Sequence, residues 1–152
     1  MNSANLLALI VAFSGILAGA MLNFLAREEI KPGKKYFILL KKILLIIMII
    51  VFINYFQLNL FLRILLYLLL IILFSLQDFR SYFVYPALGL LFYFSSFNKD
   101  LLLIQSILIF VYGLPSGTLF AENERNIFRA MARTTLYHIS FIMLPLILFL
   151  IF

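Results

Sequence analysis

Long apolar runs separated by short polar breaks fill almost the whole chain. A helix needs ~17–25 mostly apolar residues to cross ~30 Å of hydrocarbon. The runs show no in/out alternation of polar and apolar residues, so membrane helices are expected and a membrane β-barrel is not. The predicted fold is therefore an all-α, polytopic integral membrane helical bundle that forms one domain over 1–152. Its six spans are expected at 6–26, 36–56, 60–76, 82–97, 101–120 and 135–152.

The breaks between the runs contain residues typical of turns. Lys31-Pro32-Gly33-Lys34 is expected to interrupt the chain before the second span, and Asn98 lies in the break between the fourth and fifth spans. Only 27–35 and 121–134 have room outside a bilayer. Both are too short to form a separate soluble domain.

The first run also has a small-residue pattern, Ala18-Gly19-Ala20, of the kind that precedes signal-peptide cleavage. A signal peptide begins with a basic region, and no Lys or Arg precedes Leu6. The apolar run also continues past this pattern to Leu25. We therefore expect the first span to be retained.

Composition agrees with a membrane protein and excludes several kinds of chemistry. Hydrophobic residues make up 66% of the chain and charged residues 12%, against ~25% charged residues in soluble domains. The absence of cysteine excludes disulfides, thiol chemistry and Cys-ligated metals. One His and six acidic residues offer few further ligands, so we expect no metal site and no cofactor.

The net charge of +6 predicts how the chain is oriented. Basic residues beside apolar spans usually face the cytoplasm, so this charge does not indicate nucleic-acid binding. If the N-terminus is outside, ten of the twelve basic residues fall on the inner side. The prediction is a multi-pass protein of the cell membrane with both termini outside and three hairpins turning in the cytoplasm. A fourth span that failed to cross would invert everything after it.

Two Gly-x-x-x-Gly motifs are candidate helix contacts. Small residues allow two backbones to approach closely, so Gly15 and Gly19, with Ser14 beside them, predict helix packing within the bundle or between copies. The second motif, Gly113 to Gly117, contains Pro115 and Ser116. Pro115 cannot donate a backbone hydrogen bond, so this segment is either a simple kink or a broken helix that lines a ligand path together with His138.

The segment Gln77-Asp78-Phe79-Arg80-Ser81 resembles the first aspartate region of prepilin-peptidase-type intramembrane proteases over about a tenth of the chain. Such a protease needs two carboxylates close enough to share a catalytic water. The only other aspartate, Asp100, is expected at the opposite membrane face, ~30 Å away. An aspartyl protease is therefore rejected.

Basic residues form two groups that we expect to contact anions on the cytoplasmic side. Arg125, Arg129 and Arg133 fall at i, i+4 and i+8, which aligns them on one helix face. Their counterpart is either an anionic lipid surface or an acidic membrane partner that pairs with the guanidinium groups. The second group lies before and within the second span and consists of Lys34, Lys35, Lys41 and Lys42.

These observations leave three hypotheses for function. The first is a non-enzymatic subunit or scaffold of a membrane assembly, whose partner is another membrane protein or a second copy of the chain. The second is a small transporter or channel whose path is lined by a broken fifth helix. The third is a lipid-processing enzyme that uses His138 with Glu122 or Glu124.

Overall fold

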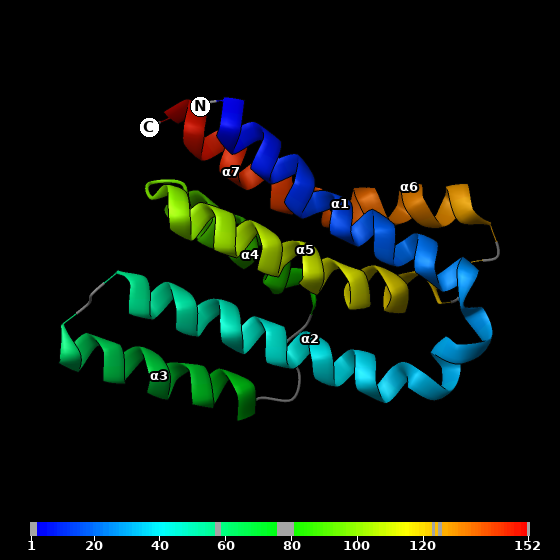
Figure 1. The fold of residues 1–152 in the computed structure, drawn as a ribbon, viewed down its shortest axis with the longest axis horizontal. Coiled ribbons are helices and arrows are strands. Elements are labelled where there is room, and N and C mark those ends of the chain that lie inside the picture. The colour runs from blue at the N-terminus through cyan, green and yellow to red at the C-terminus, as the bar shows by residue number, and fades with distance from the viewer. Residues whose placement is uncertain (1–2, 57–58, 76–80, 123, 125, 152) are drawn as a thin grey trace.

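The computed structural model describes residues 3–56, 59–75, 81–122, 124 and 126–151. Within these residues every regular element is a helix, which confirms the all-α prediction (Figure 1). The helices in chain order are α1 Ser3–Leu25, α2 Arg27–Tyr55, α3 Leu60–Ser75, α4 Ser81–Ser95, α5 Lys99–Ala121, α6 Ile127–His138 and α7 Ser140–Ile151.

The break predicted at Lys31-Pro32-Gly33-Lys34 is wrong, because α2 begins at Arg27 and continues through both Pro32 and Gly33. Proline lacks only one backbone donor, and near the start of a helix this removes a single bond to the carbonyl one turn earlier. The chain instead leaves the helical conformation at Ala26, where φ is −122° and ψ is 34°. The start of α2 is visibly bent in Figure 1.

The last predicted span also differs, because it begins earlier and is divided in two. Asn126 caps α6 by accepting hydrogen bonds from the backbone N–H groups of Phe128 and Arg129, so much of the segment 121–134, which was predicted to precede the last span, is helical. Helices α6 and α7 then meet at an angle of 41°. The bend falls at Ile139, between His138 and Ser140.

Three of the described helices are long and apolar enough to cross a membrane, and the bent α6–α7 pair would make a fourth. The three are α1, the part of α2 from Pro32 to Tyr55, and α5. Helices α3 and α4 have 16 and 15 described residues, which is shorter than a full crossing. The described residues thus contain three or four apolar segments of membrane-spanning length, fewer than the six that the sequence predicted.

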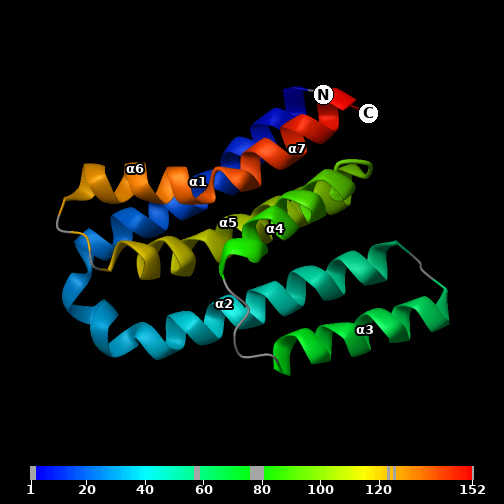
Figure 2. The ribbon, with the colours of Figure 1, turned by 180° about the vertical axis from the view of Figure 1, so that it is seen from behind.

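The helices run back and forth between two ends of the molecule (Figures 1 and 2). At one end, which we call the Asn98 end, the Tyr55 hydroxyl donates to Asn98 Oδ1 at 2.7 Å. Both termini lie toward this end in both views. At the other, the Lys34 end, Lys34 Nζ is 2.6 Å from Glu122 Oε2.

Helix α5 lies at the centre of the molecule. It packs most extensively against α1 and also contacts α2, α4 and α6, while α4 packs against α7. The side chains of Phe92, Tyr112 and Phe141 are fully buried between these helices. Helix α3 is peripheral and packs mainly against α2, with large apolar side chains such as Phe61 exposed.

Candidate functional site

Helices α1 and α5 touch backbone to backbone along the two Gly-x-x-x-Gly motifs. We call the four glycines Gly15, Gly19, Gly113 and Gly117 the glycine seam. A Cβ atom added at any of them would overlap backbone atoms of the opposite helix. The overlapping pairs are Gly15 with Phe110, Gly19 with Leu114, and both Gly113 and Gly117 with Ile16. The two motifs therefore face each other within one chain.

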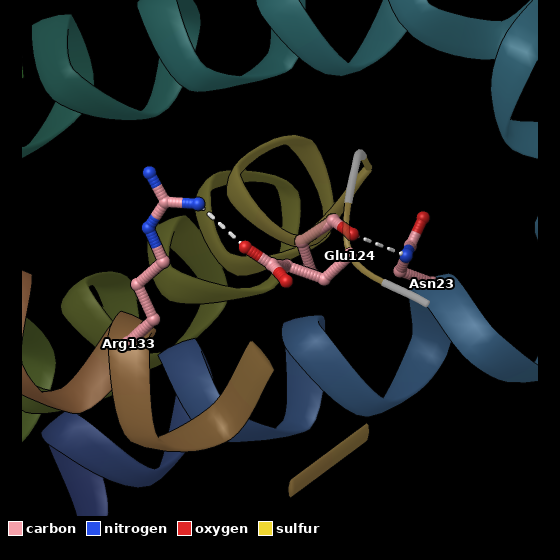
Figure 3. Close-up of polar contacts among 4 residues, drawn as sticks. Asn23, Glu124 and Arg133 are labelled. Atoms are coloured by element: carbon pink, nitrogen blue, oxygen red, sulfur yellow. Dashed lines mark hydrogen bonds and ion pairs between the residues drawn. The ribbon is translucent and has the colours of Figure 1, made fainter. Parts of the chain in front are cut away.

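Polar side chains reinforce the glycine seam near its Lys34 end. The buried hydroxyl of Thr118 lies 2.9 Å from the carbonyl oxygen of Gly19 and 2.8 Å from that of Leu114, so it can donate to either. Asn23 Nδ2 donates to the carbonyl oxygen of Ala121 at 2.8 Å. The dashed line from Asn23 in Figure 3 marks this bond. The same carbonyl also accepts from the backbone N–H of Glu124 at 3.0 Å, so the C-terminus of α5 is tied to α1 and to the following segment. Ser14, in contrast, bonds to Val11 in its own helix.

Helix α5 remains helical through Pro115, so the break that the ligand-path hypothesis needs is not present there. Pro115 is buried, and the glycines on either side of it are occupied by contacts with α1. Ser116 is the member of this motif that reaches a cavity. Of the residues predicted to line a path along α5, the two glycines and Pro115 are thus buried in helix packing, and Ser116 lines a pocket.

A pocket of about 170 Å³ lies between four helices. Helix α2 contributes one lining residue, α4 one, α5 three and α6 two. The pocket brings together Ser116 and His138, which the sequence proposed for one path, and adds a lysine that was assigned to the cytoplasmic surface. The lining residues are Lys41, Tyr85, Ser116, Leu119, Phe120, Tyr137 and His138.

His138 is fixed in one orientation by its own helix and by aromatic rings. Its Nδ1 lies 2.7 Å from the carbonyl oxygen of Thr134. A carbonyl can only accept, so Nδ1 carries the proton and the neutral ring keeps a lone pair on Nε2. The ring of Tyr85 is edge-on at 3.9 Å between centroids, with Phe120 at 5.2 Å and Tyr137 at 5.0 Å. The imidazole is thus buried and held for interaction through Nε2.

Lys41 and Ser116 bring a positive charge and a hydroxyl to the same pocket. The ammonium of Lys41 lies 5.7 Å from the centre of the Tyr112 ring, close enough for a cation–π contact. The Ser116 hydroxyl is buried near the hydroxyls of Tyr85 and Tyr112, yet no hydrogen bond of good geometry satisfies it. Lys42, the next residue, is exposed.

At the Lys34 end, acidic residues neutralise part of the predicted basic surface. Glu122 pairs with Lys34, and Glu124 pairs with Arg133, as Figure 3 shows for the second pair. Arg125 lies outside the described residues. Arg129 is exposed.

The remaining basic candidates and acidic residues are placed as follows. The Lys35 ammonium lies over the ring of Tyr36, 5.0 Å from its centre.

Neither Glu122 nor Glu124 lines the pocket that contains His138, so the carboxylate–imidazole arrangement proposed for a lipid-processing enzyme is not assembled. Within the described segments, no group of three or more His, Asp or Glu side chains could hold a metal ion. Asp78 lies outside the described residues.

Comparison with known proteins adds no function. No family model matches the chain, and no curated protein or solved structure is significantly similar to it.

Sequence reasoning missed several polar contacts between helices. Gln105 is fully buried, and its Nε2 donates to the carbonyl oxygen of Met48 in α2 at 2.8 Å. Asn23 and Thr118 make equivalent bonds between α1 and α5. A polar residue inside an apolar run is the one signal in the sequence that could have identified all three, because such residues usually face the bundle interior.

Proposed function

We infer that this protein is a non-enzymatic subunit or scaffold of a membrane assembly, embedded in the cell membrane by multiple passes. The Lys34 end is cytoplasmic in this proposal, and both termini are outside. Exposed basic side chains such as Arg129 and Lys42 would face anionic headgroups there, each worth ~1 kcal/mol near an anionic surface.

The observation that carries this proposal is the position of α3. Helix α3 packs mainly against α2, whereas α1, α4 and α5 are enclosed by several neighbours. The described part of α3 leaves large apolar side chains such as Phe61 and Leu65 exposed. An apolar helix with so few neighbours is accommodated by contact with lipid, by side chains that reach the interface, or by association with other helices.

Arg63 favours association among these responses. Its side chain is half-buried one turn into α3, and its Nε is buried without a hydrogen-bond partner among the described residues. Charged groups at such positions are generally paired within a protein interior. A helix from a partner, or from a second copy of this chain, would supply the missing acceptor and cover the exposed side chains of Phe61 and Leu65.

The other two hypotheses have weaker support. A path along α5 would need an opening at Gly113 to Gly117, where α5 is helical and packs against α1. A lipid-processing site would need Glu122 or Glu124 beside His138, and both carboxylates have basic partners elsewhere.

Single cysteines test the proposal, because the chain has none of its own. A photocrosslinker attached at Leu65→Cys on α3 should give a protein adduct of one discrete mass in native membranes. The matched position Leu103→Cys is equally apolar and exposed on α5, and it should give lipid adducts only. The adduct mass distinguishes a second copy of the chain from a different protein.

Two results would contradict the proposal. One is lipid adducts alone at both positions. The other is solute flux by the purified protein in liposomes, which would favour the transporter hypothesis.

A further inference from the structure

The pocket between α2, α4, α5 and α6 contains a positive charge that no acidic side chain among the described lining residues neutralises. Lys41 lies in the apolar part of α2, and no acidic side chain is among the residues that line the pocket. The two ion pairs found in the described part of the chain involve Lys34 and Arg133 instead. A charge in this setting requires an anion, since an unpaired ammonium beside hydrocarbon is costly.

The neutral groups of the pocket restrict which anion fits. The Ser116 hydroxyl is buried beside the hydroxyls of Tyr85 and Tyr112, and no hydrogen bond of good geometry satisfies it, so it can donate to a ligand. In the neutral ring Nε2 of His138 carries a lone pair, because Nδ1 donates to Thr134, and it can accept a hydrogen bond from a ligand. A carboxylate only accepts hydrogen bonds and would not use this lone pair. The complement is an anion that also carries a hydroxyl.

We propose that this pocket binds a phosphate group together with a hydroxyl. The source is either the phosphodiester and alcohol hydroxyl of an anionic phospholipid headgroup, or free phosphate, which carries its own hydroxyl. Lys41 neutralises the charge, Ser116 donates to a phosphate oxygen, and Nε2 of His138 accepts from the hydroxyl. Lysine is a common phosphate ligand because it acts as a point charge. The rings of Tyr85 and Phe120 hold the imidazole in place.

Size and depth agree with such a ligand. The pocket volume of about 170 Å³ is several times the ~30 Å³ that one water occupies in the liquid, which suits a phosphate group and excludes a whole lipid. Lys41 follows Lys34 by two turns of α2, or ~10 Å along the helix axis. A lysine side chain at that depth can reach back toward the headgroup layer.

The test uses the full chain in nanodiscs and three variants. Retained lipid is measured by native mass spectrometry after reconstitution in phosphatidylcholine with phosphatidylglycerol, and inorganic phosphate binding is measured by calorimetry in phosphatidylcholine alone. Lys41→Gln should weaken binding roughly tenfold or more, because it removes the charged partner. Lys42→Gln is the matched control, since it removes the same charge from the exposed neighbouring position. Ser116→Ala should also weaken binding, because it removes the hydroxyl that donates to the phosphate oxygen in this proposal.

The two sources of phosphate give different results. Retention of phosphatidylglycerol that inorganic phosphate does not displace identifies a lipid headgroup as the ligand. Saturable binding of inorganic phosphate that Lys41→Gln abolishes identifies the free ion.

The proposal is overturned if neither probe binds the parent protein, or if Lys41→Gln and Lys42→Gln weaken binding equally. Equal weakening would show general attraction to a basic surface. If Lys41→Gln does not fold, as judged by gel filtration, then Ser116→Ala decides: unchanged binding in that variant overturns the proposal.

Discussion

Replacing Gly19 by alanine tests the glycine seam most directly. The added Cβ would overlap the Leu114 carbonyl oxygen and would lie 2.9 Å from the Gly113 carbonyl oxygen. These are backbone atoms, so no side-chain rotation can relieve the contact. Helices α1 and α5 must therefore move apart.

The expected cost follows from what that movement removes. A separation on the order of 1 Å forfeits a quarter to a half of the dispersion energy of the contacting atoms. Overpacking of this kind costs ~1–3 kcal/mol in well-packed interiors. The hydrogen bonds from Thr118 to Gly19 and from Asn23 to Ala121 also lengthen, at ~0.6 kcal/mol each in a membrane. We expect Gly19→Ala to lower the free energy of unfolding by about 2–4 kcal/mol.

The measurement is the free energy of unfolding in mixed micelles, followed by far-UV circular dichroism as denaturing detergent is added. Gly33→Ala is the matched control, because a Cβ at Gly33 would meet only the flexible Phe37 ring, at 3.5 Å. Its free energy of unfolding should stay within ~0.5 kcal/mol of the parent. If Gly19→Ala is no more destabilising than Gly33→Ala, the backbone contact between α1 and α5 is not formed as described.

Two other predictions concern polar contacts and orientation. Asn23→Ala should lower the free energy of unfolding by ~0.6–1.7 kcal/mol in the same titration, because it removes a bond between helices. Asn54→Ala, which removes a bond within α2, should cost less, and equal losses would argue against the α1–α5 bond. In intact cells, single cysteines at Asn98, Gly33 and Asn126 should react with an impermeant reagent only at Asn98. Labelling at Asn126 would place the Lys34 end outside and reverse the proposed orientation.

The sequence predicted the helical class and the positions of α1 and α5 well, because an apolar run of spanning length has few alternatives to a helix. It misplaced the start of α2, since Pro32 and Gly33 were taken as a break although a proline close to a helix N-terminus removes few bonds. It also began the last span at 135, and it did not predict that Asn126 caps a helix from Ile127 or that this helix bends before α7.

The candidate site was harder to predict for a different reason. Lys41 and Lys42 are neighbours in sequence, and a helix turns by about 100° per residue, so one lines the pocket while the other is exposed. Nothing local to either residue indicates which one faces inward. The contact between Asn23 and Ala121 joins residues 98 positions apart, and a single sequence without its fold does not specify such pairs.

Because of the glycine seam, the residues that line the pocket are not held equally rigidly. Because no side chains separate their backbones there, we expect α1 and α5 to move together as one rigid pair. Ser116 belongs to α5 and so moves with this pair. Lys41, Tyr85 and His138 come from α2, α4 and α6, which are not part of the glycine seam. Changes in the width of the pocket should therefore arise as displacements of these three residues against a stationary Ser116.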